Sequence, residues 1–288
     1  MSLNKRFLLM LALSCLVLTP LLAVPISAAT TNTISVVTTL AFLADLTQEI
    51  GGSYVTVTHL VPGLGSPHSF EPTIRHLMLL QDADLFVQVG LDLEPWSEQL
   101  LKSSDRDKLR AISLGTESDH DPHIWLDEPH LIAMIEKLTK TLAEMMPSGA
   151  DYFAIQAKSF LARAEGIFAR YRRMMPQQAV SVVTAVPTYS YLLADFNLRE
   201  IGPLEEGHGD QPSAKKVAQL ISQAKTDKAV AVISEQGFDH GFGAILAQET
   251  GLPLVLLSPT PAPNEDYLSF IQRNLEMLTS AVTGVFAR

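Results

Sequence analysis

Two histidines in short, proline-containing segments are the residues of this chain best suited to metal chemistry. His68 lies in Gly-Ser-Pro-His-Ser-Phe-Glu-Pro-Thr, and His123 lies in Asp-Pro-His-Ile-Trp-Leu-Asp. Neutral imidazole binds zinc and related transition metals. The 55 positions between them exclude a local metal knuckle, but they suit two loops of one domain that converge. We interpret the pair as half of a metal site, and we expect the nearby carboxylates of Glu71 and Asp127 to orient the rings.

The beginning of the chain carries the pattern of a secretory signal. Lys5 and Arg6 precede an apolar run over residues 7–24, and small residues up to Ala29 fit a cleavage site. We expect cleavage near Ala29 and a periplasmic protein, because no later stretch approaches the roughly 20 apolar residues that a membrane-spanning helix requires. Two alternatives stay open: a retained membrane anchor, and lipid attachment through Cys15.

The composition limits both the ligands and the partners. Cys15 is the only cysteine and lies within the signal, so the mature chain has neither a disulfide nor a thiolate, and any metal must be bound by imidazole and oxygen. Without the two bases of the signal, 19 Lys and Arg stand against 31 Asp and Glu, a formal charge of −12. An acidic chain without basic clusters argues against nucleic acid and anionic membranes as partners.

The sequence lacks the common hydrolase motifs. It contains no His-Glu-x-x-His, no Gly-x-Ser-x-Gly and no recognisable pair of catalytic carboxylates. A metallohydrolase that activates water at open metal positions is therefore the weaker hypothesis. We expect a binding protein that is not an enzyme.

Short apolar strands alternate with amphipathic helices along most of the chain. This alternation predicts βαβ units and a mostly parallel sheet. In the first half we expect strands at 34–39, 54–60, 85–89 and 109–114, with helices at 42–50 and 73–81. In the second half we expect strands at 180–186, 200–204, 229–233 and 254–257, with helices at 190–196, 213–225, 241–250 and 267–286. Both histidine segments follow predicted strands, where open α/β sheets bind their ligands.

A long helix is predicted between the two halves. Residues 148–175 contain no proline and only two glycines, Gly149 and Gly166, and Pro147 and Pro176 bracket them. The sequence therefore predicts an α/β fold of two lobes, each with a mostly parallel four-stranded sheet and surrounding helices, joined by one long rigid helix. A long core helix within a single domain is the alternative. We assign residues 1–29 to the signal peptide, 30–147 to the N-terminal lobe, 148–176 to the linking helix and 177–288 to the C-terminal lobe.

The chain resembles the zinc- and manganese-binding solute-binding proteins of metal ABC transporters (cluster A-I, ZnuA/TroA-like). His68 with residues 71–73, and the segment 121–127 around His123, are similar to the two N-terminal ligand motifs of that family. The resemblance covers essentially the whole mature chain. It implies a monomeric periplasmic receptor that carries a divalent metal ion to a membrane permease, with His68 and His123 as ligands. Two nitrogen ligands favour Zn²⁺, with Mn²⁺ as the alternative.

The chain departs from that family in its second half. The resemblance implies two further ligands there, but Val186, which cannot ligate, and Ser258, a poor zinc ligand, stand at their positions. Zinc prefers four ligands near ~2.0–2.2 Å, so three completions stay open: His208 in a glycine-flanked loop, Glu235 after a predicted strand, or water. A divergent receptor that binds a chelated metal or a partner protein, with no tight free-metal site, is the competing hypothesis.

Overall fold

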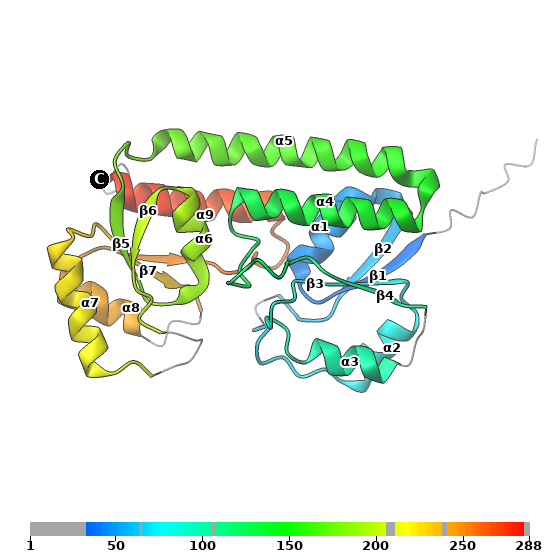
Figure 1. Cartoon of the computed structure of the whole chain (residues 1–288), viewed down its shortest axis with the longest axis horizontal. Helices are drawn as coiled ribbons and strands as arrows, with labels where there is room; N and C mark the ends of the chain where they lie inside the picture. Colours follow the sequence, from blue (N-terminus) through cyan, green and yellow to red (C-terminus); the bar gives the residue numbers. More distant parts are fainter. Residues whose placement is uncertain (1–32, 64, 105–107, 206–210, 238–240, 285–288) are drawn as a thin grey trace, which may run out of the picture. The chain divides into compact units, whose positions relative to one another are not determined.

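The computed structural model describes residues 33–63, 65–104, 108–205, 211–237 and 241–284 (Figure 1). The predicted signal peptide, including Cys15, and the candidate ligand His208 lie outside these ranges. Among the described helices, none combines the length and the apolar character that crossing a membrane requires.

The first half of the chain forms a parallel sheet of four strands in the order β2-β1-β3-β4. The strands are β1 (Ile34–Thr38), β2 (Val55–His59), β3 (Leu85–Gln88) and β4 (Arg110–Ser113). The helices are α1 (Ala41–Gly51), α2 (Ile74–Gln81), α3 (Ser97–Ser104) and α4 (Glu128–Met145). The central strands β1 and β3 are almost continuously buried because helices cover both faces of the sheet (Figure 1).

The second half repeats this arrangement with the strand order β6-β5-β7-β8, again all parallel. The strands are β5 (Val180–Thr184), β6 (Leu198–Ile201), β7 (Val232–Glu235) and β8 (Leu254–Leu257). The helices are α6 (Ser190–Asp195), α7 (Ala214–Thr226), α8 (Phe242–Thr250) and α9 (Tyr267–Thr283). The predicted α/β fold with two four-stranded parallel sheets is therefore confirmed.

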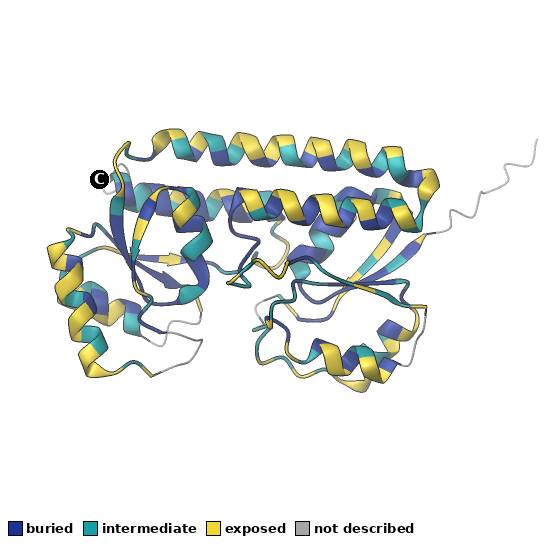
Figure 2. Cartoon of the chain, viewed as in Figure 1, coloured by how far each residue is buried: buried dark blue, intermediate teal, exposed yellow. Residues whose placement is uncertain are grey.

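The long helix α5 (Ala150–Met174) has 25 residues and follows a single 3₁₀ turn at Pro147–Gly149. It packs on α1 and α4 of the first lobe and on α9 of the second, so it contacts both lobes. Its buried residues recur at helical spacing, and buried and exposed positions alternate along it (Figure 2). The buried positions are Phe153, Ala157, Phe160, Ala164, Phe168 and Tyr171.

One contiguous hydrophobic core runs from the first sheet past α5 into the second sheet. A shared core makes relative movement of the lobes costly, because opening it exposes apolar surface to water. The domain boundaries proposed from the sequence stay a prediction.

Three local differences separate the predicted from the observed elements. Helix α3 was not expected, and for α4 the sequence predicts a helix start at Pro129 and His130 but no range; in the structure Asp127 is the N-cap of α4 and Pro129 lies in its first turn. Strand β6 begins before its predicted position, and β7 begins after it. The bounds of β6 and β7 differ from the predicted ones because residues next to the assigned strands also form backbone hydrogen bonds to β5. For example, the N–H of Val183 in β5 donates to the carbonyl of Ala231, the residue before β7 (2.9 Å).

Candidate metal centre

The two histidine segments lie at the same edge of the first sheet. The His68 segment follows β2 and the His123 segment follows β4, and the carboxyl ends of parallel strands share one edge. The two imidazole rings lie with their centroids 6.2 Å apart and their planes inclined by 58°. The structure thus brings together the two residues that the sequence singled out.

A carboxylate orients the ring of His123. The side chain is only 5% exposed, and its Nδ1 lies 2.6 Å from Oδ1 of Asp121. The same oxygen accepts the backbone N–H of His123 at 2.8 Å. An ionised carboxylate can only accept hydrogen bonds, so beside it Nδ1 is the donor, and in the neutral ring Nε2 then has the lone pair that a metal ion requires.

The carboxylates that the sequence predicted to orient the histidine rings differ from the one that orients His123 in the structure. Asp127 contacts Nδ1 of His130 at 2.8 Å and caps α4, and the Glu71 side chain is exposed. The prediction that Asp127 orients the ring of His123 is therefore wrong. The missed signal is the Asp-Pro-His sequence, in which a carboxylate two residues before His123 folds back onto both its backbone and its ring.

His68 is half-buried, and its pKa is lowered on balance even though the charge of Asp121 raises it. Burial lowers its pKa, and the charge of His123 lowers that pKa further. Both effects favour the neutral imidazole. Its loop is fixed by Trp96, whose indole N–H donates to the carbonyl of Pro67 at 2.8 Å.

The second lobe contributes buried carboxylates at the carboxyl edge of its own sheet. Glu235 ends β7, is 3% exposed, and accepts the hydroxyl of Thr188 at 2.7 Å. Burial raises its pKa, the Thr188 hydrogen bond and the charge of His123 lower it, and the charge of Glu205 raises it. Glu235 therefore lies within electrostatic range of His123.

Glu205 is a buried carboxylate that the sequence places at a strand end but that was not predicted to be a metal ligand. It follows β6, is 1% exposed, and its backbone N–H donates to the carbonyl of Ala185 at 2.9 Å. This bond holds it beside the end of β5, and its charge acts on Glu235. Its position directly after an apolar strand, as for Glu235, was the available signal.

The residues at the two positions where the family resemblance implies further ligands are buried and make only packing or hydrogen-bond contacts with their neighbours. Val186 is buried in the hydrophobic core. Ser258 is buried as well, with its backbone bonded to the side chain of Asn274 and its hydroxyl 3.2 Å from Gln236. Within the described ranges, no three His, Cys, Asp or Glu side chains are close enough to hold a metal ion together. His208 lies outside those ranges.

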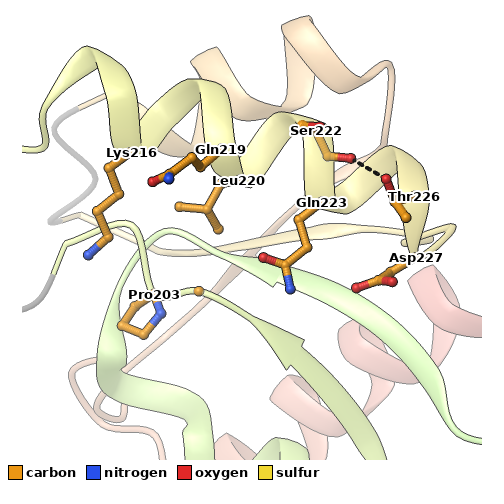
Figure 3. A pocket seen from close by; sticks show the side chains of 9 residues that line it. Pro203, Lys216, Gln219, Leu220, Ser222, Gln223, Thr226 and Asp227 are labelled. Carbon is orange, nitrogen blue, oxygen red and sulfur yellow. Dashed lines mark hydrogen bonds between the residues drawn. The ribbon is translucent and has the colours of Figure 1, made fainter.

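A separate surface pocket lies away from the histidines. It has a volume of about 800 Å³ and lies between α7 and the turn at Pro203 (Figure 3). Its lining includes Lys216, Gln219, Gln223 and Asp227 and contains neither histidine. A lone lysine, a lone carboxylate and amides do not make a transition-metal site.

Comparison with known proteins identifies similar sequences. A putative metal-binding protein of Treponema pallidum is 27% identical over 267 residues, covering 84% of each chain. The zinc-binding lipoprotein AdcA of Streptococcus pneumoniae is 24% identical over 275 residues, or 85% of this chain and 55% of AdcA. The manganese-binding lipoprotein MntA of Halalkalibacterium halodurans is 23% identical over 266 residues, or 87% of this chain and 89% of MntA. This chain therefore spans about half the length of AdcA.

Solved structures share the fold. A Cd-bound periplasmic metal-binding protein of Candidatus Liberibacter asiaticus has a TM-score of 0.78 at 21% identity and covers 87% of this chain and 100% of its own. The crystal structure of ZnuA has a TM-score of 0.76 at 28% identity and covers 86% of this chain and 99% of its own. The family described as zinc-uptake complex component A periplasmic matches residues 36–281. The chain therefore belongs to the ZnuA family of metal-binding solute-binding proteins of ABC transporters.

Proposed function

We propose that this protein captures Zn²⁺ outside the cytoplasmic membrane and delivers it to the permease of a metal ABC transporter. The observation that carries the proposal is the pair of imidazoles, His68 and His123, at one sheet edge with centroids 6.2 Å apart. Solute-binding proteins of this family are transport receptors and not enzymes. Two nitrogen ligands favour zinc over manganese, which prefers oxygen. The similar proteins include one described as zinc-binding and one described as manganese-binding.

The ring geometry is close to what one shared zinc ion requires. A zinc ion about 2.0 Å from each Nε2, at a tetrahedral angle, places the two ring centroids about 5 Å apart. The observed 6.2 Å means that the rings would approach by about 1 Å on binding. Rotation of the two side chains supplies such a shift without movement of the sheet.

The remaining ligands are proposed from the second lobe. Among the residues that the structure describes, Glu235 is the candidate, because it is buried and the charge of His123 acts on it. Its raised pKa fits a carboxylate whose charge a cation would stabilise. His208 is a further candidate from its glycine-flanked position in the sequence, and water completes the shell of four where protein ligands do not.

The proposed location is the periplasm, with the signal cleaved near Ala29. The sequence pattern of residues 1–29 supports it. The similar AdcA and MntA are described as lipoproteins, and Cys15 is the residue through which an anchor would attach here. Mass spectrometry of the mature protein distinguishes cleavage near Ala29 from lipidation at Cys15.

A second candidate function is a receptor on the same scaffold that binds a chelated metal or a partner protein. It is favoured by Val186 and Ser258 at the positions where the family resemblance implies ligands, and by the lack of a preformed three-ligand cluster among the described residues. Such a protein would bind free Zn²⁺ weakly.

The metal titration distinguishes the two functions. Purified protein is titrated with Zn²⁺ and with Mn²⁺ in competition with a chromophoric chelator, and its metal content is measured after purification without added metal. We expect one tight zinc site, weakened by about 100-fold or more in His68→Ala and in His123→Ala, which exceeds the loss from outer-shell partners. The control is His59→Ala, an exposed histidine at the end of β2, which should bind zinc as the wild-type protein does. Weak zinc binding that both site variants leave unchanged would favour the second function.

A further inference from the structure

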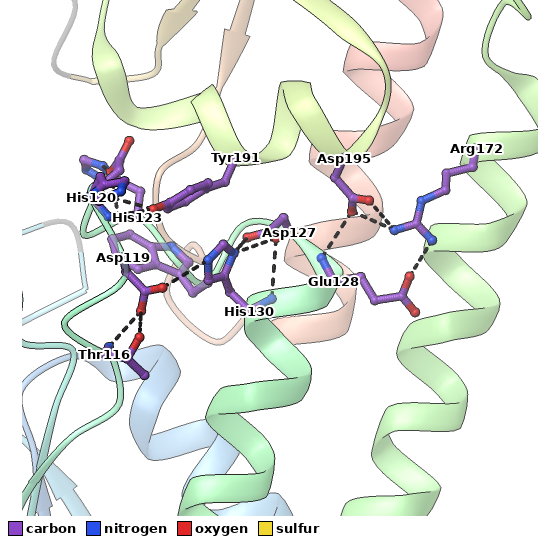
Figure 4. A network of polar contacts seen from close by, with 12 residues as sticks. Thr116, Asp119, His120, His123, Asp127, Glu128, His130, Arg172, Tyr191 and Asp195 are labelled. Carbon is purple, nitrogen blue, oxygen red and sulfur yellow. Dashed lines mark hydrogen bonds and ion pairs between the residues drawn. The ribbon is translucent and has the colours of Figure 1, made fainter.

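The segment that carries His123 is attached to the second lobe at its beginning. The hydroxyl of Tyr191, on α6, accepts the backbone N–H of His120 at 2.9 Å and that of Asp121 at 3.2 Å (Figure 4). Asp121 is the residue whose carboxylate orients the ring of His123. One hydroxyl of the second lobe therefore holds the backbone of the orienting residue.

The same segment is attached to the second lobe at its other end. The indole N–H of Trp125 donates to the carbonyl of Pro259 at 2.7 Å, and the carbonyl of Trp125 accepts the hydroxyl of Tyr267 at 2.5 Å. The indole ring lies 5.3 Å from the ring of His123. Residues 120–125 are thus bonded to the second lobe at both ends, and the candidate ligand His123 lies between these contacts.

The segment of His68 is held differently. Trp96, of the first lobe, binds the carbonyl of Pro67 and packs edge-on against Phe70 with ring centroids 4.9 Å apart. The chain has two tryptophans, and each fixes one histidine segment. The first lobe supplies the indole contact to the His68 segment, and the second lobe supplies the anchors of the His123 segment.

Tyr191 is itself held in a fixed place. Its ring packs against that of His130 with centroids 4.2 Å apart and planes inclined by 39°, and His130 is bonded to Asp127. On the same helix, Asp195 accepts the backbone N–H of Glu128 and the guanidinium of Arg172 from α5 (Figure 4). Helix α6 is thereby fastened to α4 and α5, so the hydroxyl of Tyr191 is a rigid acceptor.

We propose that Tyr191 is a positioning residue for metal binding, which acts by fixing Asp121 and through it the orientation of the His123 imidazole. This inference rests on the proposed function. Its hydroxyl satisfies two adjacent backbone donors at once. Without the Tyr191 hydroxyl, the two backbone N–H groups form hydrogen bonds with water instead. The Asp121 carboxylate then has no fixed position, and the His123 ring presents its Nε2 in several orientations. Metal affinity thereby depends on a contact between the lobes.

The test is a thermodynamic cycle with Tyr191→Phe. This variant keeps the ring on His130 and removes only the acceptor. We expect zinc affinity to fall about 10-fold, the lower end of the range for outer-shell partners. The same substitution should change affinity by about twofold or less in a His123→Ala background, and by about 10-fold in a His68→Ala background. A residue with only a general structural role would act equally in both backgrounds.

The matched control is Tyr189→Phe. Tyr189 is two residues away and buried, and its hydroxyl donates to the carbonyl of Leu257 at 2.7 Å within the second lobe. Its removal should leave the zinc affinity within about twofold of wild type in every background, because it has no bond to residues 120–125 in this network. A loss equal to that of Tyr191→Phe would overturn the inference.

A measurement on the metal-free protein tests the Tyr191 contact independently of metal binding. Amide hydrogen exchange at His120 and Asp121 should become faster in Tyr191→Phe and stay unchanged in Tyr189→Phe. Unchanged exchange at both amides, or equal affinity losses in the two histidine backgrounds, would overturn the positioning role while leaving the proposed function intact. Absence of zinc binding by the wild-type protein would overturn the proposed function and the inference with it.

Discussion

Replacement of Asp121 tests whether a carboxylate prepares His123 for metal. Asp121→Ala removes the acceptor for Nδ1 at 2.6 Å and for the backbone N–H at 2.8 Å. Loss of such an outer-shell partner lowers metal affinity about 10- to 100-fold, which corresponds to about 1.4–2.7 kcal/mol. Asp121→Asn keeps one oxygen acceptor, loses the charge and replaces the second oxygen by an amide donor. Because a charge-assisted hydrogen bond is about twice as strong as a neutral one near 1 kcal/mol, we expect a loss of about fivefold.

The assay is a zinc competition titration of both variants and of a control. Asp119→Asn is the control, because Asp119 is a carboxylate of the same loop that bonds to Thr116 and lies 3.5 Å from His130. The expected order of zinc affinity is wild type and Asp119→Asn together, then Asp121→Asn, then Asp121→Ala. Affinity of Asp121→Ala within about twofold of wild type would refute the reasoning.

Three further predictions concern pH and stability. Because burial lowers the pKa of His68 below its ordinary value near 6.5, protonation of this ring competes with zinc in acid and not at neutral pH; a zinc titration at about pH 5.5 should therefore show weaker binding than one at about pH 7.5, and equal affinity at the two pH values would count against His68 as a ligand. Arg172→Met leaves the carboxylates of Glu128 and Asp195 unpaired and should lower the free energy of unfolding by about 2 kcal/mol in urea titrations; a loss under about 0.5 kcal/mol would count against this network. Phe160→Ala removes a buried ring from α5 and should cost about 3–5 kcal/mol in the same assay, and a loss near about 1 kcal/mol would show that the site collapses around the missing ring.

Helices and strands whose buried positions follow from the hydrophobic pattern of their own residues could be predicted from the sequence. The central strand β3 begins with three buried apolar residues, 85–87, and the long helix carries its buried residues at helical spacing. The boundaries of β6 and β7 were less predictable, because their backbone bonding to β5 extends past the assigned strands and depends on a partner strand. The start of helix α4 was predictable from Pro129, but its full range was not predicted.

The candidate site was predictable where its chemistry is local. His68 and His123 stand out by type and setting, and the structure brings their rings together. The Asp121 contact is also local and could have been recognised. The role proposed for Tyr191 could not, because its contact spans about 70 positions of the sequence and depends on how the lobes pack. Which second-lobe groups complete the metal shell likewise depends on that packing.

X-ray absorption spectroscopy of the zinc-loaded protein tests the central claim most directly. The account predicts a shell of nitrogen and oxygen ligands near about 2.0–2.1 Å with the outer-shell scattering of at least two imidazoles, and one imidazole fewer in His123→Ala and in His68→Ala. A spectrum without imidazole scattering, or one that neither substitution changes, would contradict the assignment of His68 and His123 as the metal ligands.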